Sequence, residues 1–382
     1  MRGFIRTTAA LLVIGAAGCG GNGTIATIGS PQALLYVIGT GTNDIQGFQT
    51  TTLGQVEALT VPSTPTNPIP VSLALTPSRA FLYVANSASN TVSGFTVNHT
   101  TGVLAPVGSA ILPTPVCPNP ATCNFNPMGV AVDAAGQFLF VLNQGSVSPA
   151  VAPSISVFSI DANRGLLTEI GGSPFAAPVN PEFVAASPMS EFLYVSTSSG
   201  TIAAFSIGSS GALSLVAGSP FPAGADIRGM VIDPQAKFLY ATDNGNNQVA
   251  SFSIQSSGAL SPVAGSPFGA GTQPVMAAID STGTFLYVAN LGSNNVSAYK
   301  VSAGVPSQVS GSPFATAGTG VINPTQPSFL VIDPTNAFLF VGDGGTRDIA
   351  AFNIKSADGT LTMVTNSPFG QTLAPTWMLA TR

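Results

Sequence analysis

The chain has 382 residues, of which 45% are hydrophobic and only 7% are charged, and its formal net charge at pH 7 is −5. The 10 basic residues are scattered singly, which excludes the basic patch that nucleic-acid binding needs. High hydrophobic content with low charge also excludes a disordered chain. Past the N-terminus no apolar run is long enough to span a bilayer, so the apolar residues belong to short buried strands.

The N-terminal segment predicts an export signal. Two arginines precede an apolar, small-residue stretch over 8–18, which is too short for a membrane span. The stretch ends in Ala-Ala-Gly-Cys at Cys19, which resembles a bacterial lipobox, where the cysteine is lipidated and becomes the mature N-terminus. An ordinary signal peptide cleaved nearby is the alternative. We predict a signal peptide over 1–18, then a lipid-anchor cysteine and flexible tether over 19–31.

This segment also predicts a location. The protein is expected to be exported as a bacterial outer membrane lipoprotein, periplasmic or at the cell surface, and to contact the membrane only through its N-terminal lipid.

From residue 32 to the end the chain repeats one unit seven times. The anchor of each unit is an apolar strand with an aromatic residue, and the anchors are Tyr36, Tyr83, Phe140, Tyr194, Tyr240, Tyr287 and Phe340. Their successive gaps are 47, 57, 54, 46, 47 and 53 residues. A period of roughly 40–50 residues with several short strands per unit is typical of a β-propeller, in which neighbouring units bury each other's sheet faces.

The units align as four strands each. An inner strand opens with proline, as at 127–133, 274–280 and 327–333, and is followed by the anchor strand. The third strand carries a second aromatic: Phe48, Phe95, Phe158, Phe205, Phe252, Tyr299 or Phe352. A turn glycine follows, where positive φ is expected: Gly54, Gly102, Gly165, Gly211, Gly258, Gly304 or Gly359. In five units the outer strand is predicted to end in Ser-Pro-Phe.

Ring closure can be predicted too. The first unit has no inner strand of its own, and residues 375–381 match one, so the C-terminal strand should complete the first blade. The predicted fold is therefore all-β: a seven-bladed β-propeller over 32–382 with four antiparallel strands per blade.

Two cysteines, Cys117 and Cys123, lie close together before the inner strand of the third unit. An exported protein meets an oxidising compartment, which favours a local disulfide between them. A metal site needs more ligands, and the one histidine, His99, is expected on an outer turn, so we predict neither a metal nor another cofactor.

Candidate reactive residues lie just after the inner-strand proline, where the loops open on one face around the axis. These mouth positions are Val71, Met128, Glu182, Arg228, Val275, Ser328 and Thr376. Glu182 and Arg228 come from adjacent units, and Asp226 shares the loop of Arg228. A carboxylate beside a guanidinium could activate water and hold a carbonyl, so both are candidate catalytic residues. An ion pair that ties two blades together is the alternative.

The turns after the anchor strands open on the same face. Asn143, Asp243, Asn290 and Asp343 are predicted at this rim, although Asn and Asp also favour such turns through their own hydrogen bonds. The third unit carries an insertion over 146–154 at this face, which could serve recognition or be neutral variation in an exposed loop.

The motifs resemble a known family. The FLYVAN anchors at 81–86 and 285–290 are similar to YVTN-type propellers, and the longer unit with GSPF resembles the lactonase family of seven-bladed propellers, whose namesake is 6-phosphogluconolactonase. The resemblance implies a lactone site in the central pocket, formed by His, Glu and Arg side chains.

Two functions follow as hypotheses. The favoured one is a binding or interaction module at the cell envelope, monomeric, with an envelope protein, a glycan or a small lactone as partner; a purely structural surface role is not separable from it. The alternative is a lactone hydrolase that uses Glu182 and Arg228.

Overall fold

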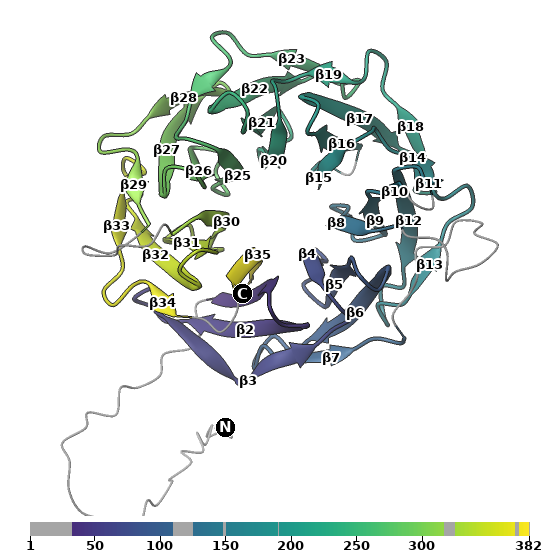
Figure 1. The fold of residues 1–382 in the computed structure, drawn as a ribbon, viewed down its shortest axis with the longest axis horizontal. Coiled ribbons are helices and arrows are strands. Elements are labelled where there is room, and N and C mark those ends of the chain that lie inside the picture. The colour runs from purple at the N-terminus through teal and green to yellow at the C-terminus, as the bar shows by residue number, and fades with distance from the viewer. Residues whose placement is uncertain are drawn as a thin grey trace, which may run out of the picture.

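A computed structural model describes residues 33–109, 125–147, 150–189, 191–316, 325–370 and 374–381. Across these ranges every regular element is a β-strand, and the strands form seven blades around one axis (Figure 1). The predicted all-β, seven-bladed propeller is thus confirmed. Within the same ranges no helix is long and apolar enough to cross a membrane. The predictions for Cys19, Cys117 and Cys123 fall outside the described residues.

The blades are numbered in chain order, and their strands are given from the axis outward. Blade 1 contains β35 (Ala374–Thr381), β1 (Ala33–Thr40), β2 (Asp44–Thr50) and β3 (Val56–Pro65). Blade 2 contains β4 (Pro70–Leu75), β5 (Phe81–Asn86), β6 (Thr91–Val97) and β7 (Leu104–Pro106). Blade 3 contains β8 (Pro127–Val132), β9 (Phe138–Asn143), β12 (Ser154–Ile160), β13 (Leu167–Glu169) and β14 (Phe175–Ala176), with the added hairpin β10 (Ser146–Val147) and β11 (Ala150–Val151).

The next four blades share one pattern. Blade 4 contains β15 (Pro181–Ala186), β16 (Phe192–Thr197), β17 (Thr201–Ile207), β18 (Leu213–Leu215) and β19 (Phe221–Pro222). Blade 5 contains β20 (Ile227–Ile232), β21 (Phe238–Asp243), β22 (Gln248–Ile254), β23 (Leu260–Pro262) and β24 (Phe268–Gly269). Blade 6 contains β25 (Pro274–Ile279), β26 (Phe285–Asn290), β27 (Asn295–Ser302), β28 (Val305–Gln308) and β29 (Phe314–Ala315). Blade 7 contains β30 (Pro327–Ile332), β31 (Phe338–Asp343), β32 (Asp348–Ile354), β33 (Leu361–Met363) and β34 (Phe369–Gly370).

The ring closes as predicted, through the two ends of the chain. Strand β35 pairs antiparallel with β1, in register from Leu34 opposite Thr381 to Tyr36 opposite Leu379 and beyond (Figure 1). Because β35 also packs against the inner strands of blades 2 and 7, it contributes both the inner edge of blade 1 and the contact between the first and last blades.

The outer strand differs from the expectation in one respect. In blades 3 to 7 it is two short segments, and the Ser-Pro-Phe motif lies between them with a cis Ser–Pro bond, so Phe begins the second segment. At this interruption the serine hydroxyl takes the place of a backbone carbonyl as the hydrogen-bond acceptor for the third strand. Ser173 Oγ accepts the N–H of Val157 at 3.0 Å, and Ser219, Ser266, Ser312 and Ser367 do the same for blades 4 to 7 at 2.8–2.9 Å. A buried backbone N–H therefore keeps a partner where the outer strand breaks.

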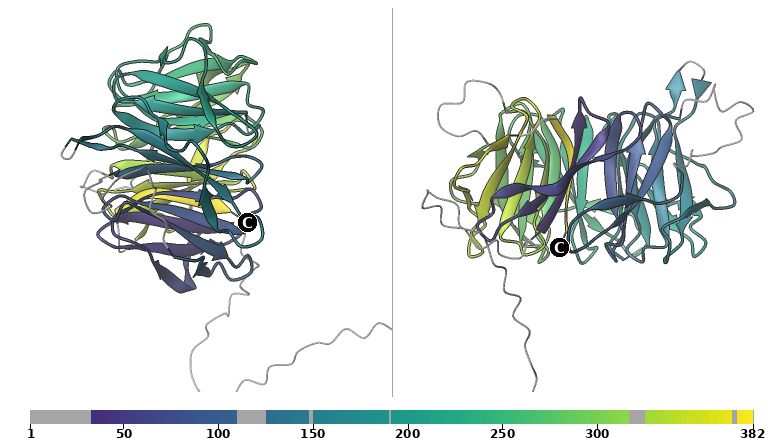
Figure 2. Two further views of the ribbon diagram at one scale, coloured as in Figure 1. Left: turned by 90° about the vertical axis from the view of Figure 1, so that its right-hand side faces the viewer. Right: turned by 90° about the horizontal axis from the view of Figure 1, so that it is seen from below.

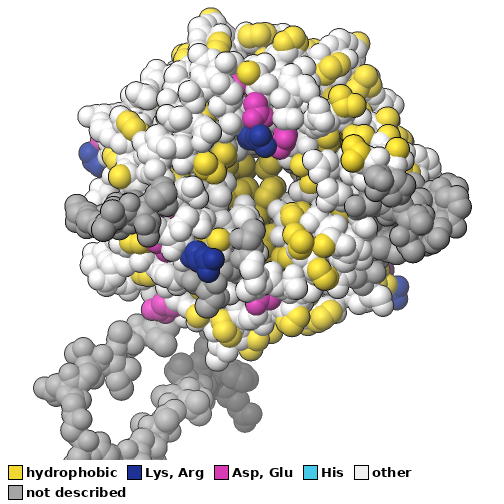
Figure 3. Space-filling model, in the orientation of Figure 1, with side chains coloured by type: hydrophobic (Ala, Val, Ile, Leu, Met, Phe, Trp, Pro, Cys, Tyr) yellow, Lys and Arg dark blue, Asp and Glu magenta, His cyan; other side chains and the backbone are white. Residues whose placement is uncertain are grey.

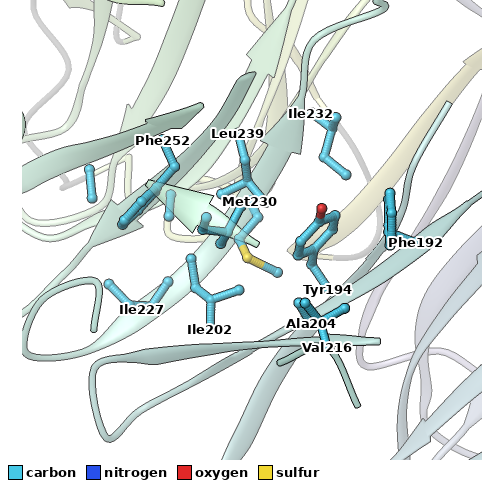
Figure 4. Close-up of a cluster of buried hydrophobic side chains, with 13 residues drawn as sticks. Phe192, Tyr194, Ile202, Ala204, Val216, Ile227, Met230, Ile232, Leu239 and Phe252 are labelled. Carbon is cyan, nitrogen blue, oxygen red and sulfur yellow. The ribbon is translucent and has the colours of Figure 1, made fainter. Parts of the chain in front are cut away.

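Neighbouring blades are locked by the anchor aromatics and the turn glycines. Each turn glycine has positive φ, as predicted, and lies against the first anchor residue of the preceding blade, as Gly258 does against Phe192. The anchor tyrosine adds a hydrogen bond, since Tyr194 Oη donates to the carbonyl of Gly258 at 3.1 Å. Figure 4 shows the apolar cluster that results between blades 4 and 5, with Met230 and Leu239 among its members. The aromatics of the third strands are buried as well, so these residues pack blade against blade.

Candidate functional site at the axial mouth

All seven mouth positions lie at a β-bulge of the inner strand. In every blade the register of the inner strand shifts at this point: Glu182 is skipped between Pro181 and Phe183, and Arg228 lies in the wider shift between Ile227 and Met230. The other blades shift at Val71, Met128, Val275, Ser328 and Thr376. A β-bulge re-aims the side chain of its extra residue. The repeat therefore presents one side chain per blade at the mouth, and only blades 4 and 5 present charged ones.

Glu182, Asp226 and Arg228, which we call the mouth trio, are in direct contact. Arg228 Nη1 donates to Glu182 Oε2 at 3.0 Å, and Arg228 Nε donates to Asp226 Oδ2 at 2.9 Å. The side chains remain accessible, with exposed fractions of 42% for Arg228, 21% for Glu182 and 19% for Asp226. The structure thus brings the two sequence-predicted catalytic residues together with the neighbouring carboxylate, on the face where charged side chains lie beside the central hollow (Figure 3).

Burial shifts the pKa of one member of the trio, Glu182. The pKa of Glu182 is raised above its ordinary value, chiefly because the carboxyl is partly withdrawn from water and also because Asp226 is nearby. Arg228 and Ser198 act in the opposite direction without cancelling this effect. A carboxylate whose pKa is raised toward neutral pH is a stronger base than an ordinary glutamate.

Beneath the mouth the axis is crossed by aromatic rings that the sequence interpretation did not single out. Phe183 of blade 4 stacks on Trp377 of blade 1 with ring centroids 5.4 Å apart, and Trp377 stacks on Phe329 of blade 7 at 4.5 Å. All three residues stand two positions after an inner-strand proline, which is the signal that could have identified them. The stack gives the axis an apolar lining directly beyond the mouth positions.

Below this stack lies an axial cavity of about 460 Å³. The side chains that line it come from inner strands of several blades and are all apolar, among them Met230, Met276 and Leu379. Apart from the indole N–H of Trp377, the described side chains that line this cavity offer no group to bind sugar hydroxyls or phosphate.

The predicted rim residues have a different placement. Asn143, Asp243, Asn290 and Asp343 are buried inside the blades at the ends of their anchor strands. Asp243 supports the mouth trio, because its Oδ1 accepts the backbone N–H groups of Ala225 and Asp226 at 3.1 and 3.3 Å. It also lines a small cavity of about 250 Å³ beside Asn246.

The third blade decorates the mouth face, as its insertion suggests. Strands β10 and β11 form a hairpin that projects from the disc when the propeller is viewed edge-on (Figure 2). Val147 at its tip is 98% exposed, and the hairpin borders a cavity of about 550 Å³ together with Gln144, Val179 and Asn180. His99, by contrast, is exposed on an outer turn of blade 2, remote from the mouth in the blade. Among the described residues no three or more His, Cys, Asp or Glu side chains gather where they could hold a metal ion.

Comparisons with known proteins agree with this architecture. A crystal structure named as a candidate 6-phosphogluconolactonase of Bacteroides fragilis is similar over 94% of this chain and 100% of its own, with a TM-score of 0.75 and 19% identity. The periplasmic gluconolactonase of Pseudomonas aeruginosa is similar over 92% of this chain and 99% of its own, with a TM-score of 0.71 and 18% identity. At these identities the likeness concerns the fold.

A comparison with curated proteins gives no match. The family model described as the lactonase, seven-bladed β-propeller family matches residues 21–120 and 218–310, together half of the chain. The predicted family resemblance is thereby confirmed, and the chain belongs to the lactonase family of seven-bladed β-propellers.

Proposed function

We propose that this protein hydrolyses small uncharged lactones at the mouth trio. The observation that carries the proposal is the contact between Glu182 and Arg228, a partly buried carboxylate and an accessible guanidinium, at the axial mouth of a lactonase-family propeller. This choice reverses the order of the two functions favoured from the sequence, because the family match and the meeting of these two side chains both support the hydrolase.

The chemistry assigns each group a role. Glu182 accepts a proton from water as the water oxygen attacks the lactone carbonyl carbon, and the N–H groups of Arg228 that are not used by its carboxylate partners bind the developing oxyanion. The ring C–O bond then breaks, and the leaving alkoxide recovers the proton from Glu182 to give a hydroxy acid. Asp226 holds the guanidinium in place, and Asp243 holds the backbone of Asp226.

Charge and polarity define the substrate class. Two carboxylates outnumber one guanidinium in the trio, so the mouth repels an anionic phosphate ester. The apolar stack below favours a ring with few hydroxyl groups. We therefore expect uncharged lactones to be better substrates than 6-phosphogluconolactone, the substrate of the family's namesake.

The test is a hydrolysis assay with the purified protein on a panel of lactones. We expect γ-butyrolactone or δ-valerolactone to be opened with a kcat/KM at least about tenfold above that for 6-phosphogluconolactone, a difference of about 1.4 kcal/mol in transition-state binding. A preference for the phosphorylated lactone would refute the substrate class, and no turnover above buffer on any lactone would refute the hydrolase.

A second candidate function is the binding module, which the hairpin of blade 3 favours. Its exposed Val147 and the cavity beside it form a recognition surface suited to an envelope protein or a glycan. If the lactone panel shows no turnover, glycan-array binding that is lost in Val147→Asp would support this function, and unchanged binding would remove it.

Export remains part of the proposal. The lipobox-like sequence at Cys19 supports an outer membrane lipoprotein, periplasmic or at the cell surface, and the same compartment supports a disulfide between Cys117 and Cys123. Mass spectrometry of the protein from bacterial membranes tests the lipid anchor. A lipid-modified N-terminal cysteine is expected, and an unmodified residue 19 would contradict the anchor.

A further inference from the structure

One repeated position of the propeller has different hydrogen-bond partners in different groups of blades. The last residue of the anchor strand faces the first residue of the third strand, with its side chain buried. In blades 2, 3 and 6 this residue is asparagine, and its amide donates to a serine hydroxyl two residues into the third strand. The bonds run from Asn86 to Ser93 at 3.0 Å, from Asn143 to Ser156 at 3.0 Å and from Asn290 to Ser297 at 2.9 Å. Buried polar atoms normally find such partners.

Blades 4 and 5 solve the same problem without asparagine. Thr197 pairs with Thr201 across the strands at 2.9 Å. Asp243 accepts N–H groups from the mouth loop and the amide of Asn246 at 2.8 Å, so its carboxylate is fully engaged. In both blades alanine stands at the position of this serine, and no asparagine amide is present to donate to it.

Blade 7 carries an aspartate at this position without any such partner. Asp343 is 0% exposed, and neither of its carboxylate oxygens has a hydrogen-bond partner in the described structure. The residue opposite is a second acid, Asp348, and the serine position is Ala350. The hydroxyl of Thr316 favours the charged form of Asp343 and also lies 2.6 Å from the hydroxyl of Thr325, a pair in which either group can be the donor.

The unsatisfied atoms of this turn are all oxygens. Both carboxylate oxygens of Asp343, Oδ1 of Asp348 and Oγ1 of Thr346 are buried and without a hydrogen-bond partner among the described residues. Asp348 and Thr346 are only partly buried as whole residues, so the cluster can be reached from the turn between β31 and β32. Four oxygens on one turn, with no nitrogen among them, match the ligand preference of a hard cation.

Blade 1 provides an internal comparison. Thr42 and Asp44 occupy the places of Thr346 and Asp348, and Oγ1 of Thr42 and Oδ1 of Asp44 are likewise buried without a hydrogen-bond partner among the described residues. The place of Asp343, however, is taken by Gly39, and Ser63 donates to Oδ2 of Asp44. Blade 1 thus has one acid, Asp44, with a hydroxyl donor, whereas blade 7 has two acids that face each other. The second carboxylate makes blade 7 different from every other blade.

Among the described residues, the two facing acids have no cationic side chain to balance their charge. No salt bridge to either acid occurs in the described part of the chain, and Arg347, in the same turn, is exposed. Two acids this close are stabilised either by a bound cation or by a shared proton.

We propose that the turn over 343–348 binds a divalent hard cation, with Ca²⁺ as the probe, through the carboxylates of Asp343 and Asp348 and the hydroxyl of Thr346. Ca²⁺ takes about six to eight oxygen ligands, so water completes the shell. Two carboxylates place the dissociation constant at about 10⁻⁴–10⁻³ M, as in extracellular calcium modules. The site is structural, holding blade 7 at its mouth end, and does not depend on the proposed hydrolysis.

The test compares thermal unfolding of the full chain in EDTA and in about 0.01–10 mM CaCl₂, which extends about tenfold on either side of the expected Kd. The wild type should gain several degrees in Tm as calcium rises, and calorimetric titration should give one site. Asp343→Asn should lose this response. Asp44→Asn in blade 1 is the matched control and should keep it.

A double variant guards against a result that reflects misfolding only. Asp343→Asn with Ala350→Ser recreates the Asn–Ser pair of blades 2, 3 and 6, so it should be at least as stable as the wild type in EDTA and indifferent to calcium. A calcium response that persists in this variant would place the ion elsewhere and overturn the proposal. The proposal would also be overturned if the Tm of the wild type did not change with calcium while its stability fell as pH rose from about 4 to about 8. That result would mean that the two acids share a proton instead of a cation.

Discussion

Removal of residues 374–382 should abolish the closed ring. The deletion takes away β35, and with it the inner edge of blade 1, the buried side chain of Met378 and the central ring of the aromatic stack, Trp377. It also exposes the unpaired edge of β1 and opens the contact between blades 1 and 7. We expect a loss of more than about 5 kcal/mol, comparable with the whole stability of an ordinary domain, so the variant should be unfolded or aggregated at 25 °C.

Circular dichroism melting and size-exclusion chromatography check this result. A control that lacks only Arg382 should behave as the full chain, because β35 ends at Thr381. A truncated protein that melts cooperatively at the temperature of the parent would show that the ring does not need its C-terminal strand, and would contradict the closure seen here.

Substitution of Gly258 by alanine should destabilise the interface between blades 4 and 5 strongly. The residue has φ of +84°, and a Cβ atom there would lie 2.3 Å from the ring of Phe192. Positive φ costs a non-glycine residue about 1–2 kcal/mol, and forcing an atom into a packed interface adds about 1–3 kcal/mol. We therefore expect a total loss of about 2–5 kcal/mol, measured by urea denaturation.

The neighbouring Gly265 separates the two contributions. Its φ of +83° is nearly the same, but a Cβ atom would find its nearest neighbour, Phe268, at 3.6 Å, which is an ordinary contact. Gly265→Ala should therefore show only the conformational cost. Equal losses of stability in the two variants would mean that the blade interface gives way around Phe192 and that the glycine is required for its backbone alone.

The architecture was predictable because its signals repeat. Seven anchor strands at a regular spacing, a turn glycine in each unit and a C-terminal segment that matches an inner strand predict the blades and their closure, and the structure confirms all three. The contact of Glu182 with Arg228 followed from placing both just after the start of an inner strand in adjacent blades. Each of these inferences needs only the repeat and the period of a strand.

Other features depend on contacts that a single unit does not contain. The serine of GSPF accepts a hydrogen bond from the third strand of its own blade, at the point where the outer strand is interrupted. In the sequence the motif therefore looks like the end of a strand, although it links two short outer segments. The stack of Phe183, Phe329 and Trp377 joins blades that are far apart in sequence. Asp343 looks like the other turn-forming residues, and only the identity of its neighbours in space, Asp348 and Ala350, reveals an unpaired carboxylate.

The most direct test of the central claim is the pH dependence of lactone hydrolysis, measured for the wild type and for Glu182→Gln, with the exposed Glu191→Gln as control. Glu182 acts as a base only when ionised, so kcat/KM should fall as pH decreases through a pKa above the ordinary glutamate value. Glu191→Gln should keep the wild-type profile, whereas Glu182→Gln should lose about 100-fold or more in rate together with this pH dependence. A Glu182→Gln profile that matches the wild type, or no turnover by the wild type at any pH, would contradict the account.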